Sequence, residues 1–253
     1  MTRIKHLFPA FVLLAAFLGL WEGYVALTGA PALVLPAPSD VVNGLRVEWD
    51  DIARHTLATL GVAVVGFSLS VAFAFIVSVV LHFSGWLRRG LMPLLVASQT
   101  VPIVALAPLM VLWFGFGLLP KVLLVILVTF FPMVVSLTAG YASLPRAFRD
   151  QLVSMGATRW SVFRRATLPS ARTQFFSGLR ISATYAIVAT IFAEYAGARR
   201  GLGIYILAAK NNFRADLVLS AVLVSACLTL ALLSVIAGIE RITGRRYRRG
   251  AHA

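Results

Sequence analysis

Six apolar stretches, each long enough to cross a lipid bilayer, dominate this sequence. They run from about Phe8 to Leu27, Leu57 to Phe83, Leu91 to Trp113, Leu118 to Tyr141, Phe175 to Ala196 and Leu217 to Ile239. A helix needs about 20 apolar residues to span the hydrocarbon core. Backbone groups in lipid must form hydrogen bonds within the protein, which favours helices. The pattern predicts an all-α integral membrane protein with about six transmembrane helices, in which residues 1–253 form a single transmembrane domain.

The first stretch has two interpretations. It follows a short charged segment, as the apolar part of a signal peptide does. However, it is longer than a typical signal-peptide core, and Trp21 and Tyr24 at its far end are typical of membrane-interface anchors. We expect it to be a retained transmembrane helix.

The formal net charge of +14 would also suit a nucleic-acid-binding protein. Here the basic residues lie in short segments between the apolar stretches, which is the pattern that orients membrane proteins and attracts anionic lipid. We therefore expect contact with membrane lipid and no nucleic acid. If the cytoplasmic segments are those richest in arginine, both termini of this multi-pass membrane protein are cytoplasmic.

Motifs for covalent chemistry are missing from the sequence. It contains no HExxH, no His/Cys cluster and no P-loop, so we expect no metal, no cofactor and no catalytic residue. A membrane enzyme would gather catalytic side chains at one face. An ion-coupled secondary transporter or a channel is a further alternative, but it would carry buried charges or a selectivity ring in its spans.

The segment between the fourth and fifth stretches, residues 143–173, is unusually long. Apolar residues at helical spacing predict two short amphipathic helices, broken at Gly156 and bounded by Pro145 and Pro169. Such a pair needs a partner, either lipid or protein, to bury its apolar stripe.

This segment resembles the cytoplasmic loop of bacterial ABC importer permeases, which carries EAA, three residues, Gly, nine residues and Ile-x-Leu-Pro. Asp150, Gln151 and Leu152 stand at the EAA positions, Gly156 at the glycine, and Leu168 and Pro169 at the end. Both spacings are preserved. The chain departs from this pattern at four positions. Asp150 stands in place of Glu, Gln151 and Leu152 in place of the two alanines, and Ala166 in place of Ile.

The resemblance covers most of the chain. Leu35 to Ser39, Trp113 to Gly117 and Gly201 to Gly203 are similar to the nitrate, sulfonate, taurine and thiamine-precursor branch of the family. Within this branch, the run Trp113 to Lys121 and the segment Ala193 to Tyr195 look most similar to permeases for pyrimidine precursors of thiamine.

This resemblance implies a type I ABC importer permease fold and a set of partners. It implies a homodimer around a central path, a separate ATP-binding subunit that carries the ATPase activity, and a solute-binding protein. Residues 143–173 would be the coupling loop, whose contact residues are Asp150, Gln151, Leu152, Gly156, Ala157, Leu168 and Pro169. The implied solute is a pyrimidine or thiamine precursor, with a sulfonate, taurine or nitrate as the alternative.

Three further residues are candidates for the translocation path or an outer docking surface. Gln99 and Thr100 precede Val101 and Pro102, so they put hydrogen-bonding groups beside a helix break in the third span. Glu194 is an ionisable residue near the end of the fifth span, where it faces the path or a docking surface, or pairs with Arg199 or Arg200 to anchor the helix end.

Overall fold

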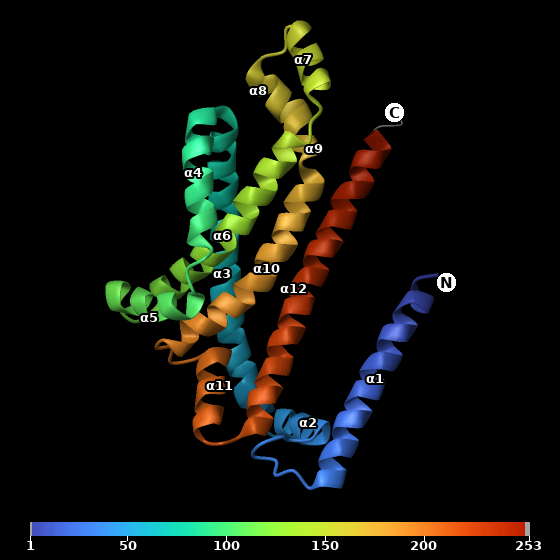
Figure 1. Ribbon diagram of the computed structural model, residues 1–253, viewed down its shortest axis with the longest axis vertical. Coiled ribbons are helices and arrows are strands. Elements are labelled where there is room, and N and C mark those ends of the chain that lie inside the picture. The colour runs from blue at the N-terminus through green and yellow to red at the C-terminus, as the bar shows by residue number, and fades with distance from the viewer. Residues whose placement is uncertain (1, 251–253) are drawn as a thin grey trace.

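The computed structural model describes residues 2–250, with side chains from 8 to 244. Over these residues the chain forms only helices, turns and loops (Figure 1). The elements are α1 (Thr2–Thr28), α2 (Pro38–Val47), α3 (Trp49–Phe83), α4 (Gly85–Ser98), α5 (Ile103–Phe114), α6 (Leu118–Ala142), α7 (Arg146–Ser154), α8 (Arg159–Val162), a π-helical turn (Phe163–Thr167), α9 (Leu168–Ser170), α10 (Arg172–Tyr195), α11 (Leu202–Asn211) and α12 (Ala215–Gly250).

Five of these helices, α1, α3, α6, α10 and α12, are long and apolar enough to cross a membrane. The sixth predicted span is a broken one, because α4 and α5 meet at an angle of 101°. The described residues thus hold five long apolar helices and one bent pair, which agrees with about six spans and confirms the break before Pro102. The break within the predicted span from Leu91 to Trp113 arises because Pro102 has no N–H to continue a helix and disfavours helical geometry at Val101.

The centre of the bundle consists of α3, α6 and α10, which pack side by side (Figure 1). Small residues let these helices approach closely. A Cβ atom on Gly66 of α3 would lie 2.7 Å from the side chain of Val125 on α6, and one on Gly178 of α10 would lie 2.7 Å from Ser136 on α6. Small residues at contacts are typical of helices that pack in lipid, where close van der Waals contact replaces the hydrophobic effect.

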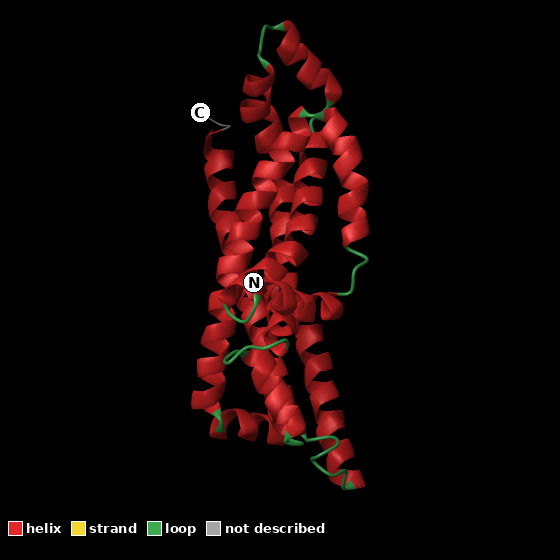
Figure 2. Ribbon diagram, turned by 90° about the vertical axis from the view of Figure 1, so that its left-hand side faces the viewer, coloured by secondary structure: helices red, strands yellow, loops and turns green. Residues whose placement is uncertain are grey.

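Two short helices, α2 and α11, lie at the end of the molecule opposite α7 and α8 (Figures 1 and 2). The hydropathy pattern did not predict them. The α2 helix begins with Pro38 and is capped by Asp40, whose carboxylate accepts a hydrogen bond of 3.0 Å from the backbone N–H of Ala37. It packs on α12, where the hydroxyl of Ser220 donates to the carbonyl of Val41 at 2.8 Å.

The first helix stands apart from the bundle. None of the hydrophobic window of α1 is buried, and its contacts are with α2. There the carboxylate of Glu22 accepts hydrogen bonds from the backbone N–H and the hydroxyl of Ser39, at 3.1 and 2.7 Å. The N-terminal end of α1 and the C-terminal end of α12 both point towards the end of the molecule that carries α7 and α8 (Figure 1).

Candidate functional site

The predicted pair of short helices is present as a hairpin of α7 and α8 at one end of the molecule (Figure 1). The turn depends on Gly156, whose φ of 87° lies in the left-handed region that favours glycine. Its N–H donates to the carbonyl of Val153 at 2.9 Å, and the N–H of Ala157 donates to the carbonyl of Leu152 at 3.0 Å. These two bonds end α7 in a Schellman motif. The hydroxyl of Thr158 then caps α8.

An aromatic cluster fixes this hairpin to the membrane helices. Phe163, in the π-helical turn after α8, is only 2% exposed. Its ring centroid lies 5.0 Å from that of His82, 5.2 Å from Phe83 and 5.3 Å from Tyr141, so it contacts the ends of both α3 and α6. Trp160 of α8 stacks on its other side at 5.6 Å. The sequence indicated the apolar character of Phe163 but not that its partner would be the chain's own bundle.

The seven predicted contact residues differ in exposure. Asp150, Gln151 and Gly156 are exposed, whereas Leu152, Ala157, Leu168 and Pro169 are half-buried. Asp150 forms an ion pair with Arg149 at 3.4 Å, and both side chains are more than half exposed, so the pair contributes little to stability.

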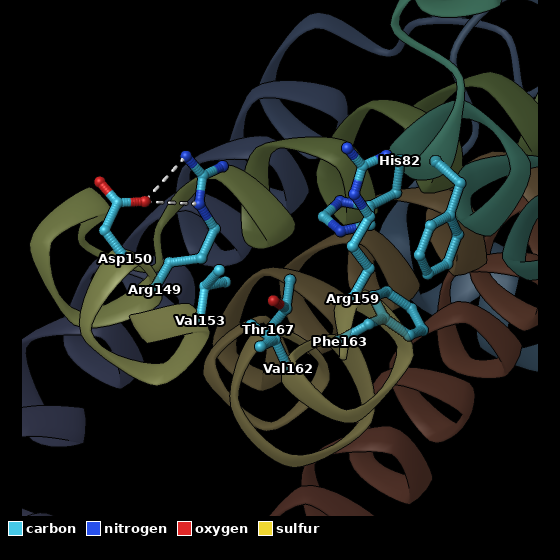
Figure 3. Close-up of a pocket in the computed structure, with 9 residues that line it drawn as sticks. His82, Arg149, Asp150, Val153, Arg159, Val162, Phe163 and Thr167 are labelled. Atoms are coloured by element: carbon cyan, nitrogen blue, oxygen red, sulfur yellow. Dashed lines mark hydrogen bonds and ion pairs between the residues drawn. The ribbon is translucent and has the colours of Figure 1, made fainter. Parts of the chain in front are cut away.

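Part of the apolar stripe remains uncovered. The exposed fractions are 48% for Phe148, 51% for Val153, 76% for Met155 and 58% for Trp160. Between the two arms lies a hollow of about 420 Å³ (Figure 3). Arg149 and Asp150 lie on one side of it and His82 on the other. The hairpin thus offers an apolar surface beside a polar hollow.

The second candidate, Glu194, is completely buried near the end of α10. The hydroxyl of Thr59 on α3 lies 2.9 and 3.0 Å from its two carboxylate oxygens, and the N–H of Gly203 on α11 donates to it at 2.8 Å. The same hydroxyl accepts a hydrogen bond of 2.8 Å from the N–H of Leu202. Glu194 therefore joins three helices, α3, α10 and α11.

The structure does not bring Glu194 to Arg199 or Arg200. Both arginines are exposed, and within residues 8–244 the carboxylate lies within ion-pair distance of no cation. The Glu194 side chain is fully buried in this conformation of the chain. Glu194 holds the end of its helix, but it does so through hydrogen bonds to Thr59 and the backbone.

Gly201 and Gly203 are what allow this arrangement. A Cβ atom on Gly201 would overlap the Glu194 carboxylate, and one on Gly203 would overlap the carbonyl of Ile191. The backbone of Gly201 also contacts His55, whose Nδ1 lies 2.8 Å from its carbonyl oxygen and 3.0 Å from its nitrogen. Sequence reasoning missed Thr59 and His55 because nothing in the sequence links them to residues 135 or more positions away.

The remaining candidates, Gln99 and Thr100, lie in the break between α4 and α5. Both are exposed. The hydroxyl of Thr100 donates to the carbonyl of Ala97 at 2.8 Å, which satisfies a carbonyl freed by the break.

A pocket of about 920 Å³ opens where the α5–α6 turn meets the segment after α10. Lys121, Arg199 and Arg200 line it together with Phe116, and no carboxylate is among its lining residues. In the predicted orientation, these three cations lie on the side of the membrane opposite the cytoplasm. They give the surface around the pocket a positive potential.

Comparison with known proteins places these features in a family. The family of binding-protein-dependent transport system inner membrane components matches residues 65–249. The riboflavin transport system permease protein RibX of Chloroflexus aurantiacus is 36% identical over 239 residues, which are 92% of this chain and 88% of that protein. The formylaminopyrimidine transport permease protein ThiX of Halalkalibacterium halodurans is 36% identical over 187 residues, 74% of each chain.

Among solved structures, the fold matches a chain of the MetNI methionine ABC transporter in an inward-facing conformation. The TM-score is 0.66 at 16% sequence identity, over 78% of this chain and 97% of that one. The predicted all-α, type I ABC importer permease fold is thereby confirmed. The chain belongs to the family of binding-protein-dependent transport system inner membrane components, as a multi-pass inner-membrane permease subunit of an ABC importer.

Proposed function

We propose that the hairpin of α7 and α8 couples this permease to a separate ATP-binding subunit. The contact surface comprises Asp150, Gln151, Leu152, Gly156, Ala157, Leu168 and Pro169, within the loop 143–173 of a single transmembrane domain. The proposal rests on one observation: the apolar residues of the hairpin are buried at its base but exposed at its tip. Phe163 at the base is buried on the permease's own bundle, whereas Met155 at the tip is 76% exposed. An exposed apolar tip on a fixed base suits a helix that inserts into a partner's groove.

Co-purification tests this role. Met155→Asp puts a charge into the proposed contact without removing a buried group, so we expect the ATP-binding subunit to be lost from the purified complex, because an unpaired charge would be desolvated. Val34→Asp is the matched control, since Val34 is 75% exposed but lies between α1 and α2 at the other end of the molecule. Retention of the subunit by Met155→Asp would refute the coupling surface.

We further propose the assembly around this chain: a homodimer, with ATP-binding subunits at the α7–α8 end and a solute-binding protein at the α2–α11 end. The α7–α8 end and both termini are cytoplasmic in this arrangement. Arg146, Arg149, Arg159, Arg164 and Arg165 lie in the α7–α8 loop, which agrees with the enrichment of arginine on the cytoplasmic side. Mass measurement of the complex in a nanodisc would contradict the homodimer by showing one permease chain.

Gln99 and Thr100 are our candidates for the translocation path. They are exposed polar groups at a break between two apolar helices, α4 and α5, and unwound backbone is tolerated at membrane depth where it lines a cavity or is covered by protein. Glu194 is assigned instead to holding α10 against α3 and α11.

For the solute we propose a nitrogen heterocycle that contains a pyrimidine ring. Support comes from the two relatives described above, because riboflavin and formylaminopyrimidine share this ring. Uptake of each labelled compound by cells that carry the complete transporter tests the assignment. Transport that Met155→Asp abolishes would support it, and absence of uptake of both compounds would refute it.

A small solute with a negatively charged group, such as a sulfonate, taurine or nitrate, is the second candidate. The pocket lined by Lys121, Arg199 and Arg200 favours it, because cations without a carboxylate attract negative charge. Competition in the same uptake assay distinguishes the two classes: only the transported class should reduce uptake of a labelled member.

A further inference from the structure

A second cavity, of about 260 Å³, lies behind the α7–α8 hairpin on the side of the bundle. It is enclosed by the end of α3, the start of α4, the end of α6, the start of α7 and the π-helical turn. The lining residues are His82, Arg88, Thr138, Tyr141, Ala142, Leu144, Arg146, Arg149 and Thr167. A space of this volume holds several water molecules, and hence a phosphate group.

Three guanidinium groups converge on this cavity, which we call the inner arginine pocket. Arg88 comes from α4, and Arg146 and Arg149 come from α7. No carboxylate lines the pocket, and within the described side chains Arg88 and Arg146 form no ion pair. Asp150 reaches only Arg149, at 3.4 Å. Like charges gathered without a counter-charge repel one another, and a phosphate accepting their hydrogen bonds would offset that repulsion.

Thr167 adds a hydroxyl group to the wall of the inner arginine pocket. It is only 2% exposed, yet its hydroxyl forms no hydrogen bond with the described part of the chain and the residue lines the pocket. Thr167 also lines the neighbouring hollow between the hairpin arms that Figure 3 shows, so it stands at the boundary between the two spaces. Because Thr167 lines the pocket, its hydroxyl can donate a hydrogen bond to a phosphate oxygen there.

The position of Arg88 distinguishes a lipid from a free anion. Besides the inner arginine pocket, Arg88 lines a shallow hollow with Arg89, Met92 and Pro93 along α4. No residue of α4 is buried, and Leu94 is 65% exposed. A phosphate in the pocket therefore lies at the edge of an apolar helix surface on which acyl chains can pack.

We propose that the inner arginine pocket binds the phosphate of an anionic phospholipid, whose acyl chains lie along α4. Arg88, Arg146 and Arg149 supply the charge and Thr167 a hydroxyl. The site does not depend on docking of an ATP-binding subunit, because it lies behind the hairpin and not on its exposed tip.

Native mass spectrometry of the full-length permease, purified with its complex, tests this proposal. The protein is exchanged into detergent and titrated with phosphatidylglycerol, with phosphatidylcholine as the zwitterionic comparison and inorganic phosphate as competitor. We expect phosphatidylglycerol to bind and Arg88→Gln/Arg146→Gln to weaken it at least about tenfold, because each arginine near a membrane surface contributes on the order of 1 kcal/mol to binding anionic lipid.

Two variants control for folding and for general charge. Arg88→Lys/Arg146→Lys keeps the charge, so most of the affinity should return. Arg164→Gln/Arg165→Gln removes the same charge from exposed positions on the same loop that do not line the pocket, so affinity should change less than twofold. Equal losses of phosphatidylglycerol affinity in the two glutamine variants would refute the proposed site. So would binding of inorganic phosphate that phosphatidylglycerol does not displace, because the ligand would then be a free anion.

Discussion

Replacing Gly156 by alanine measures the free-energy cost of a single backbone dihedral angle, the positive φ of this residue. The φ of Gly156 is 87°, and a Cβ atom added there would meet no other atom within 4 Å. The substitution therefore creates no clash and removes no contact. Its cost is that of a left-handed conformation for an L-residue, about 1–2 kcal/mol.

Because the cost falls on the conformation that presents the tip of the hairpin, we expect alanine to weaken association with the ATP-binding subunit about fivefold to thirtyfold. Asparagine, which tolerates this region, should weaken it less, and valine should weaken it more. Titrating nanodisc-embedded permease with purified ATP-binding subunit measures this order. Gly90→Ala is the control, since Gly90 lies in α4, also with open space around a Cβ atom and no unusual φ.

The reasoning would be refuted by an alanine variant that binds like wild type, or by asparagine binding more weakly than alanine. Either result would mean that the turn does not need its left-handed angle for docking.

Three further predictions concern stability. Phe163→Ala should destabilise the hairpin by about 3–5 kcal/mol and expose it to limited proteolysis, whereas the same change at the half-exposed Trp160 should have a smaller effect. Gly201→Ala should abolish accumulation of the folded protein, because its Cβ would overlap the Glu194 carboxylate, while Gly61→Ala, in open space, should express normally. Glu194→Gln should lower the thermal unfolding temperature in detergent less than Glu194→Ala, because the amide keeps one acceptor oxygen for the neighbouring donors; equal losses would show that those hydrogen bonds contribute nothing.

Much of this fold could be predicted from the sequence, because a transmembrane helix can be recognised from the length of its apolar stretch. The glycine break at Gly156 and the proline break at Pro102 were also predictable, since both act through their own backbone. The angle at Pro102 was not, because it depends on how α5 packs against α6 and α10.

The short helices α2 and α11 escaped prediction because each has only ten residues, too few to cross a membrane, and packs on distant parts of the chain. Glu194 shows the same limit. Its position suggested an ion pair with a nearby arginine, but the partners are a threonine on α3 and a backbone N–H on α11. A carboxylate can be satisfied by any converging donors, and only the tertiary structure decides which ones converge.

The ring cluster around Phe163 bears on how movement would pass from the hairpin to the bundle under the coupling that we propose. A flexible connection between the hairpin and the bundle would absorb a displacement of α7 as bending. Packed aromatic rings have little room to yield, so under the coupling that we propose a displacement of α8 should tilt α3 and α6 as well. The helix α1 packs mainly on α2 at the opposite end and lies outside this cluster, so we expect it to stay in place in the lipid when α3 and α6 tilt.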